Sequence, residues 1–186
     1  ELLQEREAMD VINNVIIPAL NRVGKDYETN KIFLPQLIQS AETTKKAFEV
    51  VKSTFRVDSQ SKGPIMMCTV EGDIHDIGKN IVKVVLESYG YQVIDLGKDV
   101  KVEKVVEAYH KYQPKMIGLS ALMTTTVVNM KKTIEALHKV NCQCPIWVGG
   151  AVLTQEIADE IGADYYSEDA MASVTLLNHI FDERGE

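Results

Sequence analysis

A histidine placed two residues after an aspartate is the most chemically informative feature of this chain. Asp73 and His75 lie in the segment Gly-Asp-Ile-His-Asp-Ile-Gly at 72–78, shortly after an apolar run at 64–70. A carboxylate at that spacing can accept a hydrogen bond from one ring nitrogen of the histidine. Such a bond fixes the tautomer and raises the basicity of the other nitrogen, so the pair predicts a metal ligand.

Two further segments carry residues that could line a ligand site. Segment 120–126 (Ser-Ala-Leu-Met-Thr-Thr-Thr) has four hydroxyls in seven residues, and segment 149–154 begins with Gly149 and Gly150. Hydroxyls can bond phosphate, sugar or amide groups, and paired glycines let a ligand approach the backbone closely. Each feature also has a purely structural interpretation: helix caps for the hydroxyls, a turn for the glycines, and a solvated or capping residue for the histidine.

The residues from 64 onward predict alternating strands and helices. Apolar runs predict strands at 64–70, 91–96, 115–120, 145–149 and 163–166. Apolar residues at steps of three and four predict helices at 78–89, 101–112, 126–139, 153–161 and 169–182. This alternation indicates right-handed crossovers and a doubly wound, flavodoxin-like parallel sheet of five strands. The strand-to-helix loops of such a sheet gather at its carboxyl edge, so the three chemical segments should meet there.

The first part of the chain has only helical periodicity. It predicts helices over 4–22 and 35–53, with Pro18 as a kink or boundary and 24–34 as a connector. Segment 58–63 is polar and closes with Gly63-Pro64, which indicates a linker and a natural hinge.

These patterns divide the chain into a helical cap domain at 1–58, a linker at 59–63 and the sheet domain at 64–186.

Composition narrows the class of protein. The net charge of −7 argues against a nucleic-acid partner, and no segment reaches the roughly 18 apolar residues of a membrane span. The charged first residues do not resemble a secretory signal, so we expect a cytoplasmic location. Cys68, Cys142 and Cys144 are expected to be reduced structural thiols, with Cys68 in the core. The lack of an initiator Met suggests a piece of a longer protein.

Other site chemistries fit poorly. The chain has neither a phosphate-binding loop ending in Lys-Ser/Thr nor the dinucleotide fingerprint. A closed zinc site needs four ligands, and the remaining histidines fall in predicted helices. A single histidine suits a metal whose other positions are filled by a macrocycle, such as a tetrapyrrole or corrin. An alternative from a different class is a regulatory or interaction module that binds no metal.

The motif Asp73-x-His75-x-x-Gly78, followed by Ser-x-Leu at 120–122 and Gly-Gly at 149–150, resembles the signature of corrinoid-binding proteins. In that family a protein histidine ligates cobalt, and a flavodoxin-like domain follows a small helical cap. The resemblance implies that His75 is the lower axial cobalt ligand, replacing the dimethylbenzimidazole of cobalamin itself. It also implies that Asp73 holds His75 and that Thr126 supplies a hydroxyl to Asp73.

The resemblance further implies a set of residues around the cofactor and its displaced nucleotide tail. They are Gly72, Asp73, His75, Asp76, Ile77, Gly78, Ser120, Leu122, Thr124, Thr125, Gly149, Gly150, Ala151, Tyr166, Asp169 and Ala170. In the cap, Tyr27, Phe33, Leu34 and Leu37 match positions that shield the upper face of the corrin, where apolar cover excludes water. These four residues could instead form the interface between the two domains, with Tyr27 and Phe33 placed in the connector.

Within the family, the cap and segment 72–82 look like cobalamin-dependent methionine synthase, whereas segment 123–126 resembles free-standing corrinoid proteins of methanol or methylamine metabolism. We predict a methionine synthase fragment that carries methyl groups by cycling between cobalt(I) and methylcobalt(III). Its donor would be methyltetrahydrofolate and its acceptor homocysteine. Its partners would be folate- and homocysteine-binding domains, or separate methyltransferase subunits, and a reactivation partner. The free-standing corrinoid protein is the alternative.

Overall fold

The structure, a computed structural model, describes residues 7–52 and 63–183. The chain divides into two compact units, Glu1–Arg56 and Val57–Glu186. The predicted linker at 59–63 lies outside the described residues apart from Gly63. None of the helices in the described ranges combines the length and apolar character needed to cross a membrane.

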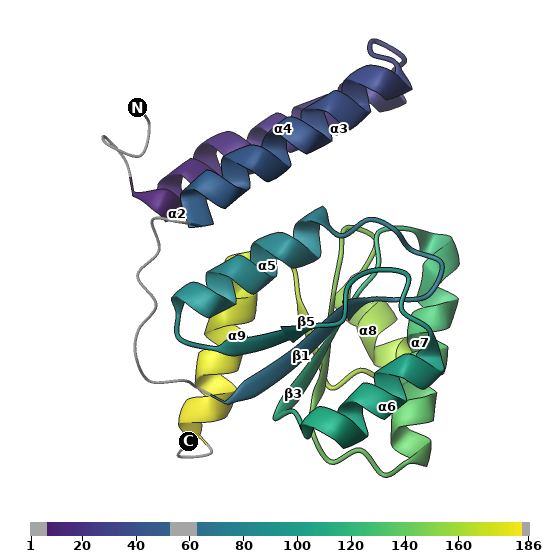
Figure 1. The fold of residues 1–186 in the computed structure, drawn as a ribbon. Helices are drawn as coiled ribbons and strands as arrows, with labels where there is room; N and C mark the ends of the chain where they lie inside the picture. The colour runs from purple at the N-terminus through teal and green to yellow at the C-terminus, as the bar shows by residue number, and fades with distance from the viewer. Residues whose placement is uncertain (1–6, 53–62, 184–186) are drawn as a thin grey trace. The chain divides into compact units, whose positions relative to one another are not determined.

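Five parallel strands form the centre of the second unit (Figure 1). They are β1 (Pro64–Thr69), β2 (Gln92–Asp95), β3 (Met116–Ser120), β4 (Ile146–Gly149) and β5 (Tyr165–Ser167). Their order across the sheet is β2-β1-β3-β4-β5, which is the flavodoxin-like order. The predicted fold class is therefore confirmed. The direction of winding changes between β1 and β3, where ligands bind in such sheets.

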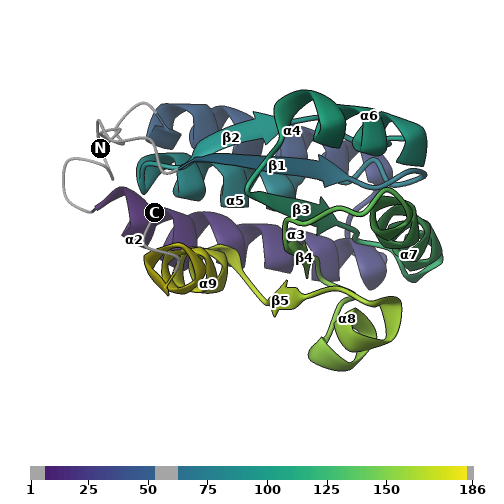
Figure 2. The same ribbon diagram turned by 90° about the horizontal axis from the view of Figure 1, so that it is seen from below.

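Helices cover both faces of this sheet (Figures 1 and 2). One face carries α5 (Ile77–Ser88) and α9 (Ala170–Glu183), and the other carries α6 (Val102–Tyr112), α7 (Thr124–Lys139) and α8 (Gln155–Ile161). Met66, Cys68 and Val70 pack into the core on the α6–α8 face, so Cys68 is the buried core residue that was predicted. Because strand residues alternate, Met67 and Thr69 point toward α5 and α9.

A close contact on the α5–α9 face explains a glycine inside a strand. Gly118 of β3 is the register partner of Trp147 in β4. A Cβ at position 118 would collide with the indole ring of Trp147. The indole is buried, and its Nε1 donates to Ser167 Oγ at 2.9 Å. Packing therefore requires a glycine at this position.

The first unit is a helical hairpin with an irregular first arm. It comprises α2 (Ala8–Val11), a π-helical turn at Ile12–Ile16, α3 (Ile17–Glu28) and α4 (Leu34–Lys52). The wide turn ends two residues before Pro18, whose ring crowds the preceding turn and which lacks an N–H to donate.

The prediction of a connector over 24–34 is wrong for residues 24–28, because α3 continues through Gly24 to Glu28. A glycine inside a helix costs only about 1 kcal/mol, and packing of α3 against α4 offsets that cost. Tyr27 therefore lies in a helix.

The actual connection is short and has defined ends. Asn30 has a left-handed φ of 56°, and the Lys31 N–H donates to Asp26 O at 2.8 Å. This is a Schellman-type ending with asparagine in the place usually taken by glycine. The Phe33 N–H then donates to Gln36 Oε1 at 2.7 Å and caps the start of α4.

Candidate functional site

Asp73 is the buried centre of the loop that follows β1. Its Oδ1 accepts a hydrogen bond from the His75 N–H at 2.9 Å and lies 2.8 Å from His75 Nδ1. Its Oδ2 accepts from the Leu122 N–H at 2.7 Å, the Met123 N–H at 3.3 Å and Thr126 Oγ1 at 2.9 Å. Both carboxylate oxygens are therefore occupied, and one side chain joins the loops after β1 and β3.

These contacts decide the charge of Asp73. Burial is the largest single influence and opposes ionisation, but hydrogen bonds from the His75 and Leu122 backbones and from the His75 and Thr126 side chains outweigh it. Together they lower the pKa of Asp73 to about 2. The carboxylate is therefore ionised at neutral pH and is held by donors on every side.

His75 presents one ring nitrogen outward. Because an ionised carboxylate faces Nδ1, the proton of the neutral ring lies on Nδ1 and Nε2 keeps its lone pair. The His75 side chain is 45% exposed, which leaves Nε2 accessible to a ligand. In the described part of the chain, no group of three or more histidine, cysteine or acidic side chains could hold a metal ion. A metal at His75 must therefore take its other ligands from elsewhere.

A second aspartate, which the sequence analysis missed, fixes the backbone of the same loop. Asp99 Oδ1 accepts from the Gly72 N–H at 2.7 Å, and the Asp99 N–H donates to Asp73 O at 3.0 Å. Gly72 has a φ of 83° and Asp99 a φ of 51°, so both adopt the left-handed conformation that this tight crossing needs. The loop after β2 thus supports the loop that carries His75.

A buried ion pair anchors the start of α5 below the His75 loop. Lys79 Nζ lies 2.7 Å from Asp95 Oδ1, and Lys83 Nζ lies 3.3 Å from Asp95 Oδ2. Burial opposes the ionised form of Asp95, but the hydrogen bonds from Lys79 and the Gly97 N–H, with the two lysine charges, outweigh it and lower its pKa. Lys79 is almost fully buried, so this pair ties α5 to the end of β2.

Small residues form a row across the carboxyl ends of four strands. Thr69, Ser120, Gly149 and Ser167 are register partners in β1, β3, β4 and β5. This small-residue row lies on the α5–α9 face, because Thr69 alternates with the core residues of the other face. Thr69 Oγ1 is buried and makes no hydrogen bond with any described residue. A buried hydroxyl without a partner is costly, which suggests that a bound ligand satisfies it.

The sequence analysis passed over Thr69 because threonine is common in strands. The alignment of Thr69 with Ser120 on the same face of the sheet is the signal that would have indicated a role for Thr69.

The paired glycines have a structural role of their own. Gly150 has a φ of 141°, and a Cβ there would collide with the backbone carbonyl of Ala121. The Ala121 N–H also donates to Gly149 O at 3.3 Å. The loops after β3 and β4 therefore approach each other closely, and this contact needs glycine before any ligand is considered.

The other predicted residues divide into two groups. Leu122 and Gly78 are exposed beside the Asp73–His75 pair, Asp76 and Ile77 are half-buried at the start of α5, and Thr124, Thr125 and Ala151 are exposed at the same edge. Tyr166 instead lies on the α6–α8 face, where its hydroxyl donates to Leu153 O at 3.0 Å.

At the start of α9, Ala170 is buried, and Asp169 Oδ1 accepts from the Ala172 N–H at 2.7 Å. In the first unit, Phe33 is exposed. The side chains of Tyr27, Leu34 and Leu37 lie outside what the structure describes.

Comparison with known protein families shows which family has this sequence. The family of B12 binding domains matches residues 63–175, and a second family with the same description matches residues 1–52. The chain belongs to the B12 binding domains. Each unit therefore matches a family of this description, and the site around His75 lies within the larger match.

Relatives of this chain include corrinoid proteins. It is 39% identical over 175 residues to dimethylamine corrinoid protein 2 of Methanosarcina mazei, which covers 92% of this chain and 82% of the relative. It is 38% identical over 179 residues to trimethylamine corrinoid protein 1 of Methanosarcina acetivorans, which covers 94% of this chain and 83% of the relative.

Solved structures agree. The monomethylamine corrinoid protein of Methanosarcina barkeri superposes with a TM-score of 0.89 at 32% identity, over 96% of this chain and 86% of that one. The methanol:cobalamin methyltransferase complex of Methanosarcina barkeri gives a TM-score of 0.64 at 31% identity, over 98% of this chain and 70% of that one.

These comparisons confirm the expected corrinoid family, with its helical cap and sheet domain. They do not support the finer assignment to methionine synthase, or its folate- and homocysteine-binding partner domains, and they favour the free-standing alternative. The assignment to methionine synthase rested on the resemblance of the cap and of segment 72–82 to that enzyme. Segment 123–126 pointed in the right direction.

Asp73 should make stability depend on pH. Because its pKa is about 2 in the folded chain and about 3.9 when unfolded, it stabilises the fold by roughly 2 kcal/mol above pH 4. This contribution is lost as the pH falls toward 2. Asp73→Asn should therefore lower the free energy of urea unfolding at pH 7 by at least this amount, and the difference from the parent should shrink in acid. Asp76→Asn, whose parent side chain caps no helix N–H, is the matched control. An equal loss of unfolding free energy in Asp73→Asn at pH 7 and in acid would contradict this account.

Proposed function

We propose that this protein is a free-standing corrinoid protein that binds cobalamin through His75 and carries methyl groups for a separate methyltransferase subunit. The observation that carries the proposal is the exposed His75 ring, whose Nδ1 is 2.8 Å from the buried carboxylate of Asp73. That arrangement leaves one nitrogen lone pair directed away from the loop. The membership of the B12 binding domains supplies the class of ligand.

The residues present fit a corrinoid with an extended tail. A single protein ligand suffices for a metal whose equatorial positions are filled by a macrocycle. The small-residue row provides short side chains and the unpaired Thr69 hydroxyl where a polar tail could lie. Exposed Ile74 and Leu122 beside His75 offer apolar surface to the macrocycle.

When bound, the corrinoid supplies a cobalt that accepts a methyl group and gives it up to a nucleophile. The chain would control the His75 ligand through Asp73. The ionised Asp73 holds the proton of the neutral His75 ring on Nδ1 and would strengthen Nε2 as an electron-pair donor to a metal. Thr126 Oγ1 has one proton and two acceptors, Asp73 Oδ2 at 2.9 Å and Met123 O at 2.7 Å. A small rotation of the Thr126 hydroxyl can therefore strengthen or weaken its hydrogen bond to Asp73.

Methylamines are the proposed source of the methyl group, because three relatives carry dimethylamine, trimethylamine and monomethylamine in their names. Methanol is the second candidate, since a methanol:cobalamin methyltransferase complex contains a similar chain. The test is to load the chain with cobalamin, reduce it and add each donor with its purified methyltransferase. Methylation with a methylamine, followed in the absorption spectrum, supports the proposal. Methylation only by methyltetrahydrofolate with a folate domain would return the chain to the methionine synthase branch.

The role of His75 can be tested in the spectrum of the bound cofactor. His75→Gly should still bind methylcobalamin, because the row and loops remain, but its spectrum should change to that of a corrinoid without a lower nitrogen ligand. His110→Gly makes the same substitution on an exposed position of α6 and should leave the spectrum unchanged. An unaltered spectrum in His75→Gly would remove this residue from the cobalt.

Thr69→Val separates binding from folding. The substitution removes a buried hydroxyl that has no described partner, so the cofactor-free protein should be equally or more stable to urea. Cobalamin affinity, measured by titration, should fall about two- to tenfold with the loss of one hydrogen bond. Thr133→Val, a buried substitution on α7, should leave affinity unchanged. Undiminished affinity in Thr69→Val would exclude this hydroxyl from the tail site.

A further inference from the structure

Two cysteines face each other at the sheet edge opposite His75, in the loop that enters β4. Cys142 Sγ and Cys144 Sγ lie 3.3 Å apart, and both residues are half-buried. They line an open cavity of about 250 Å³. Its remaining lining residues are His138, Gln143, Pro145, Asp164 and Tyr165. None of these residues belongs to the proposed cobalamin site.

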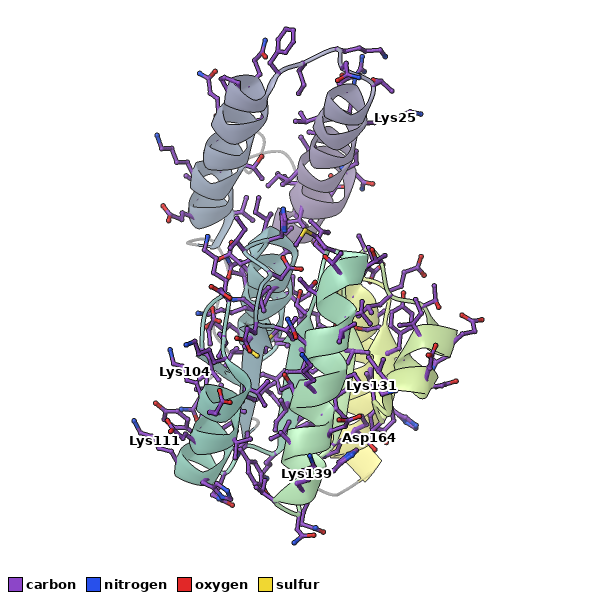
Figure 3. All side chains as sticks on the ribbon, turned by 90° about the vertical axis from the view of Figure 1, so that its right-hand side faces the viewer. Lys25, Lys104, Lys111, Lys131, Lys139 and Asp164 are labelled. Carbon is purple, nitrogen blue, oxygen red and sulfur yellow. The ribbon has the colours of Figure 1, made fainter. Side chains whose placement is uncertain are left out.

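The loop is held from three sides, so this approach of the two sulfurs is built into the fold. The Cys142 N–H donates to Leu137 O of α7 at 3.0 Å, and the Gln143 N–H donates to the Tyr109 hydroxyl of α6 at 3.3 Å. Beyond the loop, the Ile146 N–H donates to Asp164 Oδ2 at 2.8 Å. Figure 3 shows Asp164 toward the same end of the sheet domain as Lys139, the last residue of α7.

The spacing of the sulfurs favours thiol chemistry over metal binding. Two thiolates on one tetrahedral zinc ion, each about 2.3 Å from the metal, would lie about 3.8 Å apart. The observed 3.3 Å is shorter and suits a proton shared between the sulfurs. In the part of the chain that the structure describes, no third ligand joins them in a metal-binding group. A disulfide of about 2.05 Å would need only a modest further approach.

The two sulfurs differ in acidity. The hydrogen bond from the Cys144 thiol lowers the pKa of Cys142 to about 7, against the effect of burial and with help from the Tyr109 hydroxyl. The same hydrogen bond raises the pKa of Cys144. Cys142 is therefore the sulfur of the pair that ionises first as the pH rises. Cys68 differs from both, because burial raises its pKa to about 12.

We infer that Cys142 and Cys144 form a reversible redox pair that a hydroperoxide oxidises to an intramolecular disulfide. The Cys142 thiolate attacks the terminal oxygen of the peroxide, an S–O bond forms, the O–O bond breaks and an alkoxide or hydroxide leaves. Cys144 then attacks the resulting sulfenic sulfur. The S–S bond forms, and the departing hydroxide leaves as water with the Cys144 proton. The pair loses two electrons, and the peroxide gains them.

The disulfide should be easy to reduce. Cysteines separated by one residue close a very small loop, so the disulfide restricts the unfolded chain little and adds little to stability. A disulfide that stabilises the fold little costs little free energy to reduce. A dithiol reductant would therefore restore both thiols by exchange, which makes this pair a switch and not a permanent cross-link.

The test uses the full chain without cofactor. The protein is treated with about one equivalent of hydrogen peroxide and then alkylated with N-ethylmaleimide in denaturant. Intact-mass spectrometry should show two fewer alkylated sites than in the reduced protein. Treatment with dithiothreitol before alkylation should restore both sites. Cys144→Ser should stop at a Cys142 sulfenic acid that dimedone traps, whereas Cys142→Ser should give neither product. Cys68→Ser is the matched control and should still form the disulfide. Circular dichroism of each variant shows whether it is folded.

A second measurement follows the rate of Cys142 alkylation with pH in the reduced protein. The groups that face this sulfur are Cys144, Tyr109 of α6, His138 of α7 and Asp164 before β5. The expected midpoint is near pH 7, and Tyr109→Phe should move it upward without preventing the disulfide. The inference would be overturned by an alkylation midpoint near the pKa of an ordinary thiol. It would also be overturned if peroxide left every thiol free, or if it formed disulfides only between chains.

Discussion

The buried charge of Asp73 is the constraint on which the site depends. A carboxylate that is taken out of water must be surrounded by donors, and here those donors come from the loops after β1 and β3. The two loops cannot separate without leaving the charge unsatisfied. The orientation of His75 follows from this requirement, because its ring is one of the donors. Asp99 and the Lys79–Asp95 pair then fix the backbone on which the carboxylate lies.

The sequence was sufficient for the fold class because apolar runs alternate with segments of helical period, and parallel topology then brings the loops to one edge. The Asp73–His75 pairing could also be predicted, since it needs only a two-residue spacing. The N–H groups of Leu122 and Met123 could not, because backbone donors are the same for every residue type. Thr69 was overlooked because its importance depends on register with Ser120. The end of α3 was misplaced because Gly24 suggests a break, whereas packing against α4 carries the helix past it.

The choice between branches of the family shows a second limit of prediction from sequence. A histidine that is to ligate a metal needs an oriented ring and a basic free nitrogen, whichever methyl donor the protein serves. Residues such as Asp73 and His75 can therefore indicate the class of cofactor but not the reaction partner. Segment 123–126, whose resemblance favoured the free-standing proteins, includes the start of α7 and places Thr126 against Asp73. Where a motif is dictated by common chemistry, variation in its supporting loops is the better guide to the partner.

The contact between Gly118 and Trp147 gives this protein an optical property. Trp147 is the one tryptophan in the chain, and it is only 3% exposed, with its indole N–H bonded to Ser167. It shares the α5–α9 face with the small-residue row, since Trp147 and Gly149 are two positions apart in one strand. A coloured ligand on that face would take up the emission of the indole by energy transfer. The fluorescence of the protein would then decrease in proportion to the fraction of chains that hold the ligand, without any added label.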